Sequence, residues 1–103
     1  MSRITLGAKY LGETVIETFD FTSRLALGET ISTASTTAIV YSGVDASPSA
    51  IISGTSTISG QTVTQKVTGG TLGVTYLLLC TISTSLGQTL ELSAFLPIVP
   101  DND

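Results

Sequence analysis

The stretch that decides the fold is Tyr76-Leu77-Leu78-Leu79-Cys80-Thr81-Ile82-Ser83. Successive side chains of an extended strand point to opposite faces, so every second residue here lies on one apolar stripe: Tyr76, Leu78, Cys80 and Ile82. Leu77 and Leu79 make the opposite face apolar as well. A strand with two apolar faces is either central, with both faces covered, or covered by a partner. An ambiguous register is the alternative explanation for this pattern.

The residues on either side of this stretch also alternate. Residues 89–96 place Leu90, Leu92, Ala94 and Leu96 on one face and Phe95 on the other, where it is a candidate neighbour of Leu77 and Leu79. Pro97 and Pro100 are expected to end this strand, because proline has no backbone donor. Earlier strands are predicted over residues 13–21, 30–41, 50–53, 56–58 and 61–68.

Two of these predicted strands have alternatives. Glu13 and Glu17 are four residues apart, which would also allow a short helix over residues 13–21. Residues 30–41 have apolar side chains on both parities, which predicts either a bulge or a two-sided strand. About seven short strands with regular turns favour a single immunoglobulin-like antiparallel β-sandwich over residues 13–98.

The composition agrees with an all-β domain. Ser and Thr supply 31 of the 103 residues, and Val, Ile and Thr together supply 34. Stiff β-branched side chains suit a pleated sheet, and only three prolines argue against a mucin-like disordered stalk. The length supports one domain. Residues 1–12 are expected to be an N-terminal arm, extended or loosely ordered until it meets a neighbour, and residues 99–103 a C-terminal tail.

Residues that are missing from the chain exclude several classes of function. There is no His and only one Cys, which rules out the usual zinc sites, imidazole-based catalytic triads and an intrachain disulfide framework. We therefore expect no catalytic, cofactor-binding or metal-binding residues. The net charge of −4 argues against binding to nucleic acid or to an anionic membrane. No apolar run approaches the ~20 residues of a membrane span, and no signal peptide is expected. Cys80 is expected to be a small buried hydrophobic residue.

Three further features have ordinary explanations. The glycine-rich loop Gly69-Gly70-Thr71-Leu72-Gly73 precedes a strand, whereas phosphate loops precede a helix, so a structural role is favoured. The acidic residues fit surface carboxylates better than a cation site or an acid–base pair: Glu13, Glu17, Asp20, Glu29, Asp101 and Asp103. Tyr76 fits either a tyrosine corner, whose hydroxyl ties a loop to a strand, or a plain core tyrosine.

One segment resembles a known family. Residues 19–32 read Phe19-Asp20-Phe21-Thr22-Ser23-Arg24-Leu25-Ala26-Leu27-Gly28-Glu29-Thr30-Ile31-Ser32, similar to the opening of small virion proteins of tailed bacteriophages. Further matching segments follow in the same order: Gly43-Val44-Asp45, Ile58-Ser59-Gly60-Gln61-Thr62-Val63, Gly69-Gly70, Gly73-Val74-Thr75-Tyr76 and Gly87-Gln88-Thr89-Leu90. The resemblance spans residues 13–98. Members often have a Trp where this chain has Thr36-Thr37-Ala38.

The resemblance is to phage fiber-tail adaptors and immunoglobulin-like head-tail structural proteins. It implies a non-enzymatic building block of the virion, assembled in the host cytoplasm and present in multiple copies in a symmetric assembly. Its partners would be tail, connector or fiber subunits. The expected contact residues are Leu77, Leu79 and Phe95 on the sandwich, and Lys9, Tyr10 and Leu11 in the arm. The alternatives are a capsid decoration protein, or a carbohydrate-binding or adhesin module, which the absence of Trp disfavours.

Overall fold

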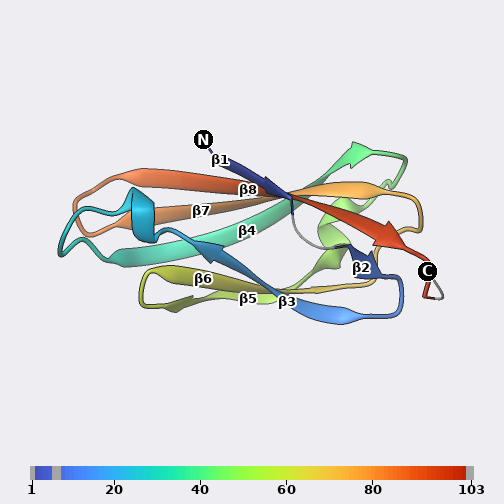
Figure 1. The fold of residues 1–103 in the computed structure, drawn as a ribbon, viewed down its shortest axis with the longest axis horizontal. Helices are drawn as coiled ribbons and strands as arrows, with labels where there is room; N and C mark the ends of the chain where they lie inside the picture. The colour runs from blue at the N-terminus through green and yellow to red at the C-terminus, as the bar shows by residue number, and fades with distance from the viewer. Residues whose placement is uncertain (1, 6–7, 102–103) are drawn as a thin grey trace.

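Two β-sheets stack face to face in the computed structural model, which describes the backbone of residues 2–5 and the whole of residues 8–101 (Figure 1). The larger sheet has the order β1-β8-β7-β4, and β2 also pairs with β8. Its strands are β1 (Ser2–Thr5), β2 (Lys9–Tyr10), β4 (Ile31–Ser42), β7 (Thr75–Thr84) and β8 (Thr89–Val99). The smaller sheet has the order β3-β6-β5, with β3 (Thr14–Asp20), β5 (Ile52–Ser59) and β6 (Thr62–Thr68).

The predicted all-β sandwich is therefore confirmed, and residues 14–20 form a strand and not a helix. The immunoglobulin-like connectivity is a finer statement that stays a prediction. Two short 3₁₀ segments connect the layers: η1 (Thr22–Arg24) between β3 and β4, and η2 (Pro48–Ile51) between β4 and β5. Among the described residues, no helix has the length and apolarity that a membrane crossing needs.

The core lies between the sheets and follows the alternation read from the sequence. The even-numbered residues of β7 point inward, and Tyr76, Leu78 and Cys80 have no exposed surface. They pack with buried residues from other parts of the chain: Phe19, Phe21, Ile31, Ala38, Val63, Val67, Leu92, Ala94, Leu96 and Ile98. The apolar period of two thus produces a single core shared by both sheets.

Strand β4 contains the irregularity that its mixed parity predicted. Its register against β7 shifts between Ile31 and Thr33 and again between Val40 and Ser42. Each extra residue reverses which side chains face inward. Ile31 is buried as a result, whereas Ile39 and Tyr41 lie on the outer face of the larger sheet with 55% and 59% of their surface exposed.

Two boundaries differ from the prediction. Residues 50–53 and 56–58 do not form separate strands: Ile51 belongs to η2, and Ile52–Ser59 is one strand with a register irregularity between Ser53 and Thr57. Pro97 also does not end the last strand, which continues to Val99. The N–H of Ile98 bonds to Val74 in the direction of β7, so the position of Pro97 faces the opposite edge. That edge pairs with β1 as far as Phe95 and with β2 only from Ile98, so no ladder bond is lost at Pro97.

The N-terminal segment pairs with its own chain. Residues 2–5 and 9–10 both run parallel to β8, along the edge opposite β7 (Figure 1). Met1, Leu6 and Gly7 of the predicted arm, and Asn102 and Asp103 of the predicted tail, lie outside the described residues. The division into arm, sandwich and tail stays a prediction.

Candidate protein-interaction face

The outer face of the larger sheet carries the apolar side chains that the sequence placed opposite the core. Leu77 on β7 lies directly across from Phe95 on β8, and on its other side from Ile39 on β4. Leu79 lies across from Ser93 and Thr37. Leu77, Leu79 and Phe95 are half-buried, because neighbouring strands cover their sides while their tips face outward. The structure therefore brings together the three residues chosen from strand parity.

Two members of this surface were not among the residues predicted for it. Tyr41 packs edge-on against Phe95, with ring centroids 4.4 Å apart and planes at 61°. Ile39 completes the row Ile39, Leu77, Phe95 across three strands. The shared parity of Ile39 and Tyr41 was visible in the sequence, but Ile31 has the same parity and is buried. The register shift between Ile31 and Thr33 puts Ile31 on the inner face of the sheet, whereas Ile39 and Tyr41 lie on the outer face. We call Ile39, Tyr41, Leu77, Leu79 and Phe95 the apolar face.

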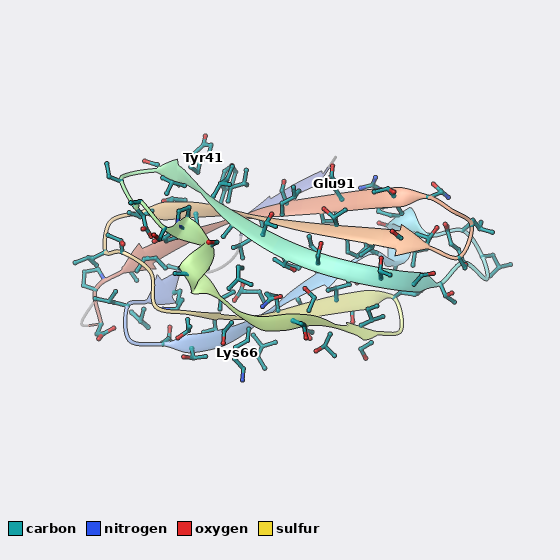
Figure 2. The ribbon with its side chains drawn as sticks, turned by 180° about the vertical axis from the view of Figure 1, so that it is seen from behind. Tyr41, Lys66 and Glu91 are labelled. Atoms are coloured by element: carbon teal, nitrogen blue, oxygen red, sulfur yellow. The ribbon has the colours of Figure 1, made fainter. Side chains whose placement is uncertain are left out.

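The apolar face has a polar border on the side of Glu91. Figure 2 shows Tyr41 and Glu91 on the outer side of the larger sheet, and Lys66 pointing away from the smaller sheet on the opposite side. Glu91 accepts a hydrogen bond from the Thr81 hydroxyl at 3.3 Å, two cross-strand pairs beyond Leu79 and Ser93. The apolar face thus ends at this polar pair.

The three residues predicted in the arm lie along the end of β8. Tyr10 and Leu11 have 39% and 37% of their surface exposed. Tyr10 is in register with Val99, which has the same parity on β8 as Phe95. Lys9 has only 1% of its surface exposed, and its ammonium donates to the carbonyls of Tyr10, Leu11 and Gly69. Burial lowers the pKa of Lys9, while Glu13 and Asp101 act in the opposite direction. In this structure Lys9 links β2 to the β6–β7 loop.

Three polar side chains with shifted pKa values, those of Tyr76, Asp45 and Glu29, serve as structural ties. The Tyr76 hydroxyl donates to the Asp45 carboxylate and accepts from the Thr71 N–H at 2.9 Å, so it joins two loops to β7. Glu29 accepts hydrogen bonds from the Thr84 hydroxyl, the Ala26 N–H and the Gln88 amide. These hydrogen bonds hold the pKa values of Asp45 and Glu29 below their usual range. They consume the carboxylate oxygens that an acid–base pair would need.

Two further candidates from the sequence, the Cys80 thiol and the Gly69–Gly73 loop, have structural roles. Burial raises the pKa of the Cys80 thiol to about 11, so it is neither a nucleophile nor a ready metal ligand at neutral pH. Within residues 8–101, His, Cys, Asp and Glu side chains form no cluster of three that could hold a metal ion. The Gly69–Gly73 loop leads into β7, a strand, as its structural interpretation predicts.

Comparison with protein families matches residues 9–97 to Gp77, described as podophage GP4 fiber-tail adaptor protein gp77. The chain belongs to this family. The resemblance noted in the sequence to phage fiber-tail adaptors is thereby confirmed. Searches of the curated proteins and of the solved structures find no match. Membership in an adaptor family identifies a structural component of a phage virion that joins other tail or fiber proteins. The apolar face can bind a partner by packing its apolar and aromatic side chains against that partner.

Proposed function

We propose that this chain is a non-enzymatic adaptor that docks onto another virion protein through the apolar face. The observation that carries the proposal is the cross-strand row Ile39, Leu77 and Phe95, extended by Tyr41 and Leu79. Apolar side chains gathered on one sheet face, with a polar border, are typical of protein-binding surfaces. The face also contains two large aromatic rings, Tyr41 and Phe95, and aromatic residues are enriched at protein interfaces.

Rigidity is what the sandwich contributes to this role. The five residues come from three strands that pair continuously, so their relative positions are set by the ladder and by the core beneath it. A preorganised surface loses little conformational entropy on binding. We infer that the chain presents this face in multiple copies on a symmetric particle after assembly in the host cytoplasm. Tyr10 and Leu11, exposed at the end of β8, are a secondary contact.

The geometry of the aromatic pair favours protein contact over glycan binding. Sugar-binding modules stack the flat face of a sugar ring on an exposed aromatic ring. Tyr41 and Phe95 meet at 61°, so the two rings form no common flat platform. A wedge-shaped pair of this kind fits a pocket on a protein partner.

The experiment compares two outward substitutions on the same strand. Phage lacking this gene is supplied in trans with wild-type protein, with Leu79→Asp, or with the control Ser83→Asp, which is exposed on the same outer face beyond the apolar face. Infectious particle yield and the amount of the chain in purified particles are measured. We expect Leu79→Asp to lower both by about tenfold or more, because a carboxylate at a desolvated contact costs at least 1.4 kcal/mol. Ser83→Asp is expected to assemble normally.

Thermal unfolding of the isolated variants separates docking from folding. If Leu79→Asp unfolds the isolated domain, the milder Leu79→Ser is used in the same assembly assay; if that variant unfolds as well, Leu79 belongs to the chain's own core and the proposal is refuted. Normal assembly of a folded Leu79 variant would refute the proposal. Imaging of the wild-type particle then locates the chain on tail, head-tail junction or capsid and counts its copies, which separates the adaptor from a capsid decoration protein.

A further inference from the structure

The side of the sandwich formed by β4 and β5 combines two outward strand edges with strands that contain no charged residue. β4 ends the larger sheet and β5 ends the smaller one, so in the described part of the chain neither strand has a partner on its outward edge. Neither Ile31–Ser42 nor Ile52–Ser59 contains a charged residue, although the chain carries twelve, 4 basic and 8 acidic. We call this surface the β4/β5 side.

Open sheet edges are normally protected, because their unpaired N–H and C=O groups would otherwise pair with another chain. The edge at β3 carries Glu17 and Asp20, and the edge at β8 is covered by β1 and β2. β5 is interrupted by the irregularity between Ser53 and Thr57. β4 has none of these protections between its two bulges: Thr33–Val40 pairs with β7 without interruption and contains neither charge nor proline. Those eight residues offer an edge of about 26 Å.

A hollow lies directly under this edge. Its volume is about 230 Å³, and it is lined by Ala34, Ser35 and Thr36 of β4, by Gly54, Thr55 and Ser56 of β5, and by Gln65. The buried Gln65 accepts from the Ser56 hydroxyl at 2.8 Å, and Ser56 is bonded to the Thr36 hydroxyl at 2.9 Å. These side-chain hydrogen bonds link β4 to β5 across the sandwich. They hold the two strands in place and, within the described residues, leave the backbone groups on the outward edge of β4 unpaired.

We propose that the β4/β5 side is a homotypic interface, in which β4 pairs antiparallel with β4 of a second copy about a two-fold axis. Such an interface must match itself, because each copy contributes the same patch. Hydroxyl groups satisfy this requirement, since each can both donate and accept: Thr33, Ser35 and Thr37 on the outward face of β4 can bond to the same groups of the partner. The absence of charge from both strands lets two chains of net charge −4 meet without opposed carboxylates.

The available area fits a weak, concentration-dependent dimer. The molecule measures 44 × 21 × 19 Å, so an edge of about 26 Å offers roughly 500 Å² across the width of this side. Two such patches bury about 1,000 Å² in total, which is the size of a weak or transient interface. η2 follows β4 in the chain and lies near one end of the β4/β5 side, away from the labelled Glu91 (Figure 2). The pairing therefore centres on Thr33–Thr37, above the hollow. The apolar face reaches β4 only at Ile39 and Tyr41, beyond Thr33–Thr37, and its other members on β7 and β8 stay available for another partner.

Sedimentation velocity of the purified chain tests the proposal between about 1 µM and about 1 mM. The expected result is a concentration-dependent shift from 10.6 kDa to twice that mass. Ser35→Lys places like charges directly across the two-fold axis at the centre of the pairing, and Ser35 lies beside Thr81 of β7, outside the apolar face, so this variant is expected to weaken the dimer by about tenfold or more. Thr18→Lys is the control: it introduces the same charge at an exposed hydroxyl residue on another edge strand, β3, and is expected to leave the dimer unchanged.

Amide hydrogen exchange provides a direct readout of the pairing. Amides of Thr33–Val40 are expected to exchange more slowly at high than at low protein concentration, while those of β3 are expected not to change. If Ser35→Lys lowers the unfolding temperature more than Thr18→Lys does, Thr33→Lys is used in its place.

Three results would overturn the inference. The wild-type chain could remain monomeric at about 1 mM. The dimer could be insensitive to Lys at positions 35 and 33, or be equally weakened by Thr18→Lys. The dimer could instead be abolished by Leu79→Asp alone, which would locate it on the apolar face. Ser35→Lys and Leu79→Asp test the inference and the proposed function separately, because Ser35 lies beside Thr81, outside the apolar face.

Discussion

The run Leu77-Leu78-Leu79 allows one prediction to be worked through quantitatively, because adjacent identical residues face opposite environments. Leu78 has no exposed surface and packs in the core, whereas Leu79 is half-buried on the outer face. Leu78→Ala removes buried methyl groups and leaves an enclosed cavity, which costs about 3 to 4 kcal/mol. Leu79→Ala loses part of the same transfer free energy and leaves no enclosed cavity, so it costs about 1 kcal/mol.

The two variants should therefore differ by about 2 to 3 kcal/mol in the free energy of unfolding. For a domain of this size, that difference corresponds to roughly 10 °C or more in Tm. The assay is urea unfolding of the isolated chain followed by far-UV circular dichroism, with the m-value as a control for the unfolded state. Equal losses in the two variants, or a larger loss for Leu79→Ala, would refute the assignment of Leu79 to the outer face. The apolar face would then have no basis.

Three further predictions follow from the buried polar groups. Lys9→Met should lower the free energy of unfolding by about 2 kcal/mol, because the carbonyls of Tyr10, Leu11 and Gly69 lose a charged donor. A urea midpoint matching the wild type would contradict this. Hydrogen bonds hold the pKa of Glu29 below 4.5, so its stabilisation is complete above that pH and is lost as the pH falls through the lower folded-state pKa. The acid-induced drop in urea midpoint should therefore be smaller in Glu29→Gln than in the wild type, and an identical drop would argue against the assignment. Since burial raises the pKa of Cys80 to about 11, a thiol reagent at about pH 8 should react only as the chain unfolds, and immediate reaction with native protein would disprove its burial.

The local pattern was sufficient to predict most of the sandwich. Alternation in a strand is a property of neighbouring residues, so the inward stripe of β7 and the outward direction of Leu77, Leu79 and Phe95 could be read without knowing the partners of any strand. The β5–β6 hairpin was predicted from a turn at Ser59-Gly60 and from the β-branched residues around it. The hairpin is present, but Ser59 pairs with Thr62, so the two turn residues are Gly60 and Gln61, one position later than predicted. These features depend on sequence separations of a few residues.

Features that depend on distant residues could not be predicted in this way. Lys9 was expected to contact a neighbouring protein as part of the N-terminal arm, but its side chain is buried within its own chain, and one of its three carbonyl partners lies 60 residues away. Pro97 was expected to end β8, and the strand continues because the pairing changes from β1 to β2 on that edge. Both differences arise from which segment lies beside the residue, not from the residue itself.

The sequence by itself determined that this chain is an all-β domain with an apolar stripe on both sides of its central strand, because side-chain alternation and β-branched composition are local. Only the tertiary structure decided that Tyr41 completes the apolar face with Phe95, and that β4 remains an open, uncharged edge. Both depend on strand order and on the two register shifts in β4, which result from pairing between segments more than 30 residues apart in the chain. A single extra residue in a strand reverses every side chain beyond it, so the membership of a surface is settled only when the strands are paired.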